Sequence, residues 1–192
     1  MRVLETKVYK FDELSDDAKD NAREWKRTCF SQDADWHEFA IEDAKECITL
    51  LGFAVTDVLY TGFWSQGDGA CFTGHWYAEN VCPVAKMRAH APKDAVLLRL
   101  SRDLNALARK DKEAFATLTH RDRYCNENTI EFSVDCRRDD TADTLKELGR
   151  EAMQWIYRQL EAEYEYHTAD AQLDDAIRAN EYEFTESGRV AS

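Results

Sequence analysis

The sequence has few of the residues that interrupt folded structure. Only 7 of its 192 residues are glycine and 2 are proline. Flexible linkers and low-complexity arms are rich in these residues, so their scarcity argues against both. Four of the seven glycines lie within residues 60–74, which distinguishes that segment from the rest of the chain.

Long apolar runs are also missing. No stretch approaches the roughly 18 to 20 apolar residues that are needed to span a bilayer. The opening MRVLETKVYK carries charge at every second or third position and has no small-residue cleavage site, so no secretory signal is expected. These absences predict that the protein stays in the cytoplasm where it is made.

Closely spaced metal ligands are absent as well. The chain has six cysteines, but they are widely separated and no CxxC pair occurs. Disulfide frameworks are typical of short secreted chains, and structural zinc sites need paired ligands. We therefore expect free thiols in a reducing compartment, with no metal and no cofactor.

Positive charge is scarce over most of the chain. The formal net charge is −13, although residues 85–126 reverse the trend with 10 basic and 5 acidic side chains. Contacts to phosphate need lysine and arginine, so no direct binding of nucleic acid is expected. An acidic protein instead suits a partner protein with a basic surface.

Apolar and aromatic residues are plentiful. Hydrophobic residues make up 44% of the chain and include 5 Trp, 8 Tyr and 9 Phe, which is enough for a folded core. A length of 192 residues favours a single domain over residues 1–192.

Hydrophobic periodicity predicts the secondary structure. Alternating apolar and polar residues predict strands near 3–11 and at 129–136. A run of β-branched and aromatic residues predicts a strand at 53–63, with a returning strand at 70–77. Apolar residues at helical spacing predict helices at about 15–29, 35–51, 93–110, 112–119, 141–168 and 170–180. No regular alternation of strand and helix occurs. The pattern predicts an α+β fold, in which several helices cover a small antiparallel sheet. That sheet consists of a hairpin at about 53–77 and the strands near 3–11 and 129–136.

The glycine-rich segment YTGFWSQGDGACFTG predicts the tip of the hairpin. Its functional interpretation is a recognition loop. Gln66 and Asp68 would offer an amide and a carboxylate, and Trp64 and Phe72 would offer flat apolar surface beside them. No Gly-Lys-Ser or Gly-Lys-Thr follows, so the segment is not a phosphate-binding loop.

Two other interpretations of this hairpin stay open. In the first, the turn is structural, and Ser65 and Asp68 form hydrogen bonds with their own backbone. In the second, Gln66, Asp68, Cys71 and His75 line a pocket of an enzyme or of a ligand-binding or metal-binding protein. Cys71 and His75 are four residues apart on one strand, whereas direct neighbours on a strand face are two apart. No catalytic residue is assigned.

The C-terminal segment 161–186 is strongly acidic. It contains nine acidic residues, interleaved with aromatic ones, against a single arginine, Arg178. Such a surface can dock on a basic groove or imitate a phosphate backbone. The alternative is an acidic helix pair that its charge keeps soluble. The candidate binding residues in this segment are Glu161, Glu163, Glu165, Asp170, Asp174 and Asp175.

Three segments carry a resemblance to a known family: FDELSDDAK at 11–19, GFWSQGDGACF at 62–72 and IRANEYEF at 177–184. Together they resemble a family of small bacteriophage and prophage proteins, some of them loosely labelled antitoxin-like. The resemblance implies a phage or mobile-element origin and a place of action in the bacterial host cytoplasm. It implies no catalytic residues.

These observations predict a non-enzymatic protein that binds and blocks a host protein through its acidic surface. A nucleic-acid-handling defence complex is one such target, which makes the chain an anti-CRISPR candidate. One alternative is an enzyme, or a ligand-binding or metal-binding protein, with its pocket at residues 60–77. The other is an antitoxin-like partner of a basic toxin.

Overall fold

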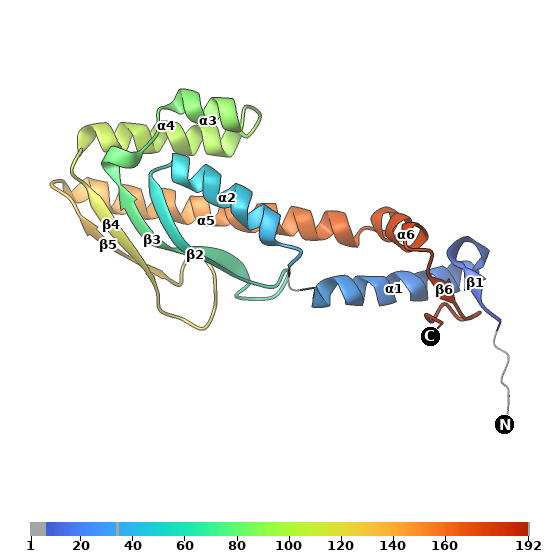
Figure 1. The fold of residues 1–192 in the computed structure, drawn as a ribbon. Helices are drawn as coiled ribbons and strands as arrows, with labels where there is room; N and C mark the ends of the chain where they lie inside the picture. The colour runs from blue at the N-terminus through green and yellow to red at the C-terminus, as the bar shows by residue number, and fades with distance from the viewer. Residues whose placement is uncertain (1–6, 34, 192) are drawn as a thin grey trace. The chain divides into compact units, whose positions relative to one another are not determined.

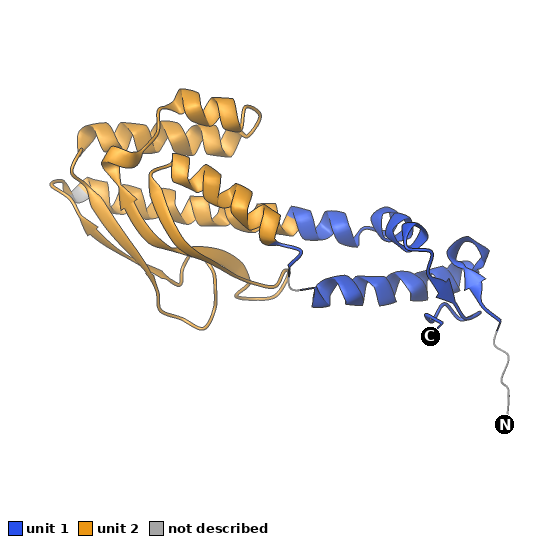
Figure 2. Ribbon diagram, in the orientation of Figure 1, with its two compact units in different colours: residues 1–37, 162–192 blue, residues 38–161 orange. Residues whose placement is uncertain are grey.

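The computed structural model describes residues 7–33 and 35–191, and of Asp139 it describes the backbone alone. The chain has an α+β fold, as the sequence predicted (Figure 1). It forms two compact units (Figure 2). Unit 1 contains residues 1–37 and 162–192, and unit 2 contains residues 38–161. The single domain stays a prediction, because two compact units can belong to one domain.

Unit 2 is built on a four-stranded antiparallel sheet with the strand order β2-β3-β4-β5. Its helices lie against one face of this sheet (Figure 1). The strands are β2 (Phe53–Thr61), β3 (Gly69–Tyr77), β4 (Phe115–His120) and β5 (Ile130–Asp135). The helices are α2 (Glu38–Leu50), the short η2 (Ala78–Asn80), α3 (Val84–His90), α4 (Ala95–Lys110) and the part of α5 (Asp139–Thr168) that ends at residue 161.

The core of unit 2 follows from the alternation along its strands. In β3, Phe72 and Trp76 are fully buried, whereas His75 between them is half-exposed. The indole Nε1 of Trp76 donates a hydrogen bond to the carbonyl oxygen of Leu51 at 3.0 Å, so its one polar group is satisfied. The buried strand residues pack against apolar residues of the helices, such as Leu104. One face of the sheet therefore forms the core, and residues of the opposite face, such as Thr73, His75 and Glu131, are half-exposed or exposed, apart from the buried Cys71.

Unit 1 consists of helices and a two-stranded sheet. Its elements are β1 (Tyr9–Lys10), the short η1 (Phe11–Glu13), α1 (Asp16–Gln32), the end of α5 from residue 162, α6 (Asp170–Ala179) and β6 (Glu183–Phe184). The Ser15 hydroxyl caps α1 by accepting a hydrogen bond from the Ala18 backbone N–H at 3.4 Å. Phe11, Ile177 and Phe184 form the centre of a small core of their own.

The prediction for the first strand was wrong in two respects. The strand was expected near 3–11 and in the same sheet as the hairpin. Residues 3–6 lie outside the described residues, and only Tyr9 and Lys10 form a strand, β1. β1 pairs with β6, because Phe11 and Phe184 bury their rings together in the core of unit 1.

The helix predicted at 112–119 was also wrong. Residues 115–120 form β4, which pairs with β3 on one side and with β5 on the other. The burial of this segment alternates, with Ala116 and Leu118 buried and Thr119 exposed. A short apolar run has no periodicity strong enough to separate helix from strand, and pairing with two neighbouring strands decided this one.

The other predicted elements agree with the structure to within a few residues. The hairpin is present as β2 and β3, the strand at 129–136 is β5, and the five remaining helices are α1, α2, α4, α5 and α6. The short helix α3 was not predicted. Within the part of the chain that the structure describes, no helix has both the length and the apolar character needed to cross a membrane.

Candidate functional site

The turn between β2 and β3 is closed by its own polar groups. The backbone N–H of Ser65 donates a hydrogen bond to Oδ2 of Asp68 at 2.7 Å, and the N–H of Asp68 donates to the Ser65 carbonyl at 3.1 Å. Thr61 and Gly69 form the last residue pair before the turn. Asp68 therefore stabilises the turn, as the structural interpretation of this segment predicted.

A second loop, residues 121–129, braces the tip of the hairpin. The amide of Asn126 donates a hydrogen bond to the Gly67 carbonyl at 3.1 Å. A Cβ atom added at Gly69 would lie 2.4 Å from the Cβ of Asn126, so only glycine permits this approach. The ring of Tyr124 covers Gly67. No local sequence pattern indicates this contact, because the loop lies more than 50 residues from the tip.

Trp64 stands at this braced turn in a strained conformation. Its φ is +71°, in the left-handed region that residues other than glycine rarely adopt. Trp64 is 66% exposed, and its ring lies 5.6 Å from the ring of Phe63 between centroids. Strain of this kind costs roughly 1 kcal/mol and clusters at binding and active sites. The turn thus presents a large aromatic side chain to solvent.

Two substitutions at Trp64 will measure this strain. Both remove the indole, but only glycine relieves the left-handed backbone, so Trp64→Gly should be about 1 kcal/mol more stable than Trp64→Ala. Chemical denaturation of the two variants gives the difference directly. Equal stability, or a more stable alanine variant, would show that the turn is not strained.

Phe72 was predicted to offer flat surface beside Trp64, and the structure corrects this. Its ring is fully buried and packs edge-on against Phe53, with 5.1 Å between centroids. The pairing of Phe72 with Val58 places it on the helix-covered face of the sheet. Tyr124, which is 41% exposed, supplies the second aromatic surface at the tip, while Gln66 is exposed in the turn.

The structure gives Cys71 and His75 separate surroundings. Cys71 is fully buried, and burial raises the pKa of its thiol to about 12, so the thiol stays protonated at neutral pH. The His75 ring stacks on Phe115 at 5.5 Å between centroids, and its Nδ1 lies 3.4 Å from the Thr117 hydroxyl. This arrangement gives no support to a cysteine nucleophile activated by histidine.

No metal centre is visible in the described part of the chain either. There, no group of three or more histidine, cysteine, aspartate or glutamate side chains is placed to hold a metal ion.

Carboxylates lie near the aromatic residues that support the tip. Phe63 packs between Tyr60 and Tyr157, with ring centroids 6.4 and 5.6 Å away. Burial raises the pKa of the Tyr157 hydroxyl, and the charges of Glu161 and Asp68 raise it further. Glu161 and Asp68, which we predicted in two separate binding sites, therefore both lie close enough to Tyr157 to act on its hydroxyl.

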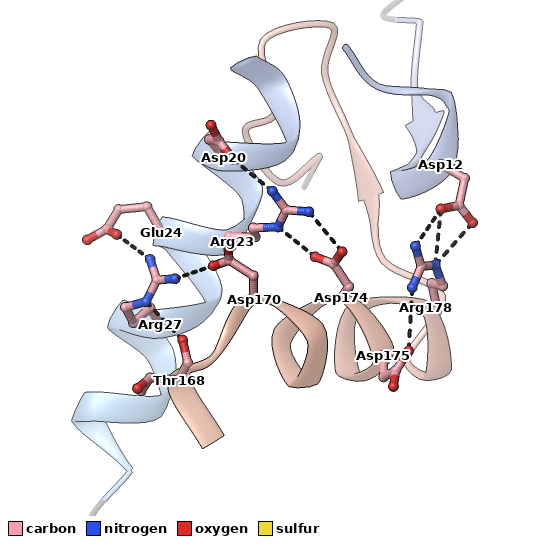
Figure 3. A network of polar contacts seen from close by, with 10 residues as sticks. All are labelled: Asp12, Asp20, Arg23, Glu24, Arg27, Thr168, Asp170, Asp174, Asp175 and Arg178. Carbon is pink, nitrogen blue, oxygen red and sulfur yellow. Dashed lines mark hydrogen bonds and ion pairs between the residues drawn. The ribbon is translucent and has the colours of Figure 1, made fainter. Parts of the chain in front are cut away.

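Two acidic residues of α6, Asp170 and Asp174, have partners on α1 (Figure 3). Arg23 forms two hydrogen bonds with the carboxylate of Asp174, at 2.7 and 2.8 Å. Arg27 contacts Asp170 at 2.9 Å. No local sequence pattern indicates these arginine partners, because they lie more than 140 residues away along the chain. Asp174 therefore joins α6 to α1 through a mostly buried ion pair, whereas the pair of Asp170, which is 66% exposed, contributes little.

The remaining candidate acids are less tightly held. Asp175 is exposed and lies 3.4 Å from Arg178, which itself pairs with Asp12 (Figure 3). Glu163 contacts His167 at 3.0 Å. Glu165 is exposed on α5. The acidic residues of this segment thus divide into structural ion pairs and exposed charges.

The fold and the site define an α+β protein with a braced, aromatic hairpin tip on an antiparallel sheet. A family model described as "Domain of unknown function (DUF8835)" matches residues 36–170. This chain belongs to that family. The matched range contains all of unit 2, including the hairpin tip and the loop that braces it. No curated protein and no solved structure matches the chain.

Proposed function

We propose that this protein is a non-enzymatic binding protein that docks on a partner protein through the hairpin tip, with Trp64 as its anchor. The observation that carries the proposal is a tryptophan that is 66% exposed on a turn fixed by Asp68 and Asn126. Tryptophan is enriched among the residues that dominate binding energy at interfaces. A rigid turn loses little conformational freedom on binding, which favours affinity.

The charge around the tip indicates the chemistry of the partner. Asp68 and Glu161 lie close enough to act on Tyr157, and the chain as a whole carries a net charge of −13. A complementary partner has an apolar pocket for the indole and basic residues around it. Attraction of this kind speeds association and weakens as the salt concentration rises.

The resemblance of the hairpin to phage and prophage proteins supports a bacterial host protein as the partner. Binding would block that protein. A nucleic-acid-handling defence complex fits, because surfaces that grip phosphate are basic. A basic toxin encoded beside this chain would offer a similar surface, and identification of the partner separates the two.

The test compares the wild-type protein with Trp64→Ala. Tagged protein is used to capture partners from lysate of the bacterial host, and the dissociation constant for the purified partner is then measured at low and high salt. We expect Trp64→Ala to bind at least about tenfold more weakly, because loss of an aromatic anchor costs about 2 kcal/mol or more.

Phe39→Ala is the matched control. Phe39 lies on α2 in the same unit and is 88% exposed, so its loss removes a comparable apolar surface from a different element. The control should bind like the wild type. A partner that binds Trp64→Ala and wild type equally well would refute the proposed docking site.

A further inference from the structure

A cavity of about 500 Å³ lies in unit 2 between the β4–β5 connection and α5. This volume is in the range of small-ligand sites. Its floor is apolar, formed by Ile130 and Phe132. The polar and charged lining residues are Arg121, Asp122, Asn128, Thr129, Glu131, Lys146 and Arg150.

Arg150 is the unusual residue in this cavity. It is half-buried, and its Nε atom is buried without a hydrogen-bond partner among the described residues. No described carboxylate forms an ion pair with it. A buried donor left without a partner is costly, and such groups are rare in native proteins.

The backbone beside Arg150 is fixed by a close packing contact. A Cβ atom added at Gly149 would lie 2.6 Å from the ring of Phe132 on β5. Glycine therefore lets α5 approach the sheet at this point. The start of the Arg150 side chain is held beside the apolar floor of the cavity.

Most of the other charged side chains in the lining have interaction partners of their own. Glu131 forms an ion pair with Arg121. Asp122 accepts a hydrogen bond from the backbone N–H of Arg123 at 2.6 Å. Lys146 has only a long contact, 3.4 Å, to the exposed Asp143. The lining holds three cationic side chains against two carboxylates, so the cavity has an excess of positive charge.

We propose that this cavity binds an oxyanion, the carboxylate or phosphate group of a small ligand, with Arg150 as the principal donor and Lys146 as a second cation. The guanidinium group presents a planar fork of N–H donors that matches both groups. A bound oxyanion gives the guanidinium group an acceptor and neutralises the excess charge. The site is independent of the hairpin tip, and either proposal can fail without the other.

The test titrates the full-length protein with sodium phosphate and, separately, with sodium acetate, at constant ionic strength maintained with chloride. The readout is the arginine Nε–H region of the ¹H–¹⁵N NMR spectrum, in which the Arg150 signal is the one lost in Arg150→Lys. A saturable shift of that signal supports the site. A response to phosphate alone or to acetate alone identifies the preferred group. No saturable shift with either anion overturns the proposal.

Variants separate this site from general ion binding, with the melting temperature as a second readout. The wild type should melt at a higher temperature in the anion that binds, and Arg150→Met should weaken the binding about tenfold or more. Arg150→Lys keeps the charge without the fork and should fall between them. Arg158→Met removes an exposed arginine from the same helix and should bind like the wild type. Equal stabilisation of Arg150→Met, Arg150→Lys and the wild type would overturn the assignment.

Discussion

Gly74→Ala is expected to lower the free energy of unfolding by about 3 kcal/mol or more. Gly74 lies in β3 with a φ of +141°, a conformation that side chains with a Cβ rarely adopt. A Cβ atom there would lie 2.0 Å from the carbonyl oxygen of Ala54 on the adjacent strand. Because the colliding atom belongs to the backbone, the sheet itself must move. Urea denaturation, followed by tryptophan fluorescence, measures the loss.

The position of Gly74 explains why the sheet needs glycine there. Gly74 pairs with Val55, and the register between β2 and β3 shifts between Val55 and Val58. An irregularity of this kind brings one backbone close to its neighbour. Gly62→Ala is the control, because the nearest atom to its added Cβ is a side-chain oxygen of Asp68 at 3.5 Å. The control should change stability by less than about 0.5 kcal/mol, and equal losses in both variants would contradict the argument.

Asp174→Asn is expected to lower the free energy of unfolding by about 2 kcal/mol. The side chains of Arg23 and Asp174 are 20% and 16% exposed, and two hydrogen bonds join them (Figure 3). The substitution removes the negative charge and replaces the paired carboxylate with a poorly matched amide, while Asp20 still accepts a hydrogen bond from Nη1 of Arg23 at 2.8 Å. Chemical denaturation followed by circular dichroism is suitable, because the affected helices contribute strongly to that signal.

Asp175→Asn makes the same change one residue further along α6. Its side chain is 81% exposed and lies 3.4 Å from Arg178, so we expect a loss below about 0.5 kcal/mol. The comparison also bears on the acidic surface. Charge reversal at Asp174 would disturb folding, so tests of docking charge belong at exposed positions such as Glu165. If Asp174→Asn were as stable as Asp175→Asn, Asp174 would again be available as a docking residue.

The sequence determined the features whose signals are local. Alternating apolar residues predicted β5, and a cluster of turn residues between two β-branched and aromatic runs predicted the hairpin. Helical spacing placed the longest helix, α5, to within two residues at its start. These signals are reliable because each depends on residues a few positions apart. The sequence also singled out Trp64, which the structure shows exposed at the tip.

Contacts between distant residues became visible with the folded structure. In the folded chain, the Phe72 side chain points into the core, and residues 115–120 form a strand between β3 and β5. Asn126 lies against the hairpin tip. The fold also gave Asp174 an arginine partner and left the Nε atom of Arg150 without one among the described residues. Burial and charge pairing depend on which surfaces come into contact when the chain folds. Partners about 60 to 150 positions apart therefore cannot be recognised from the residues around either of them.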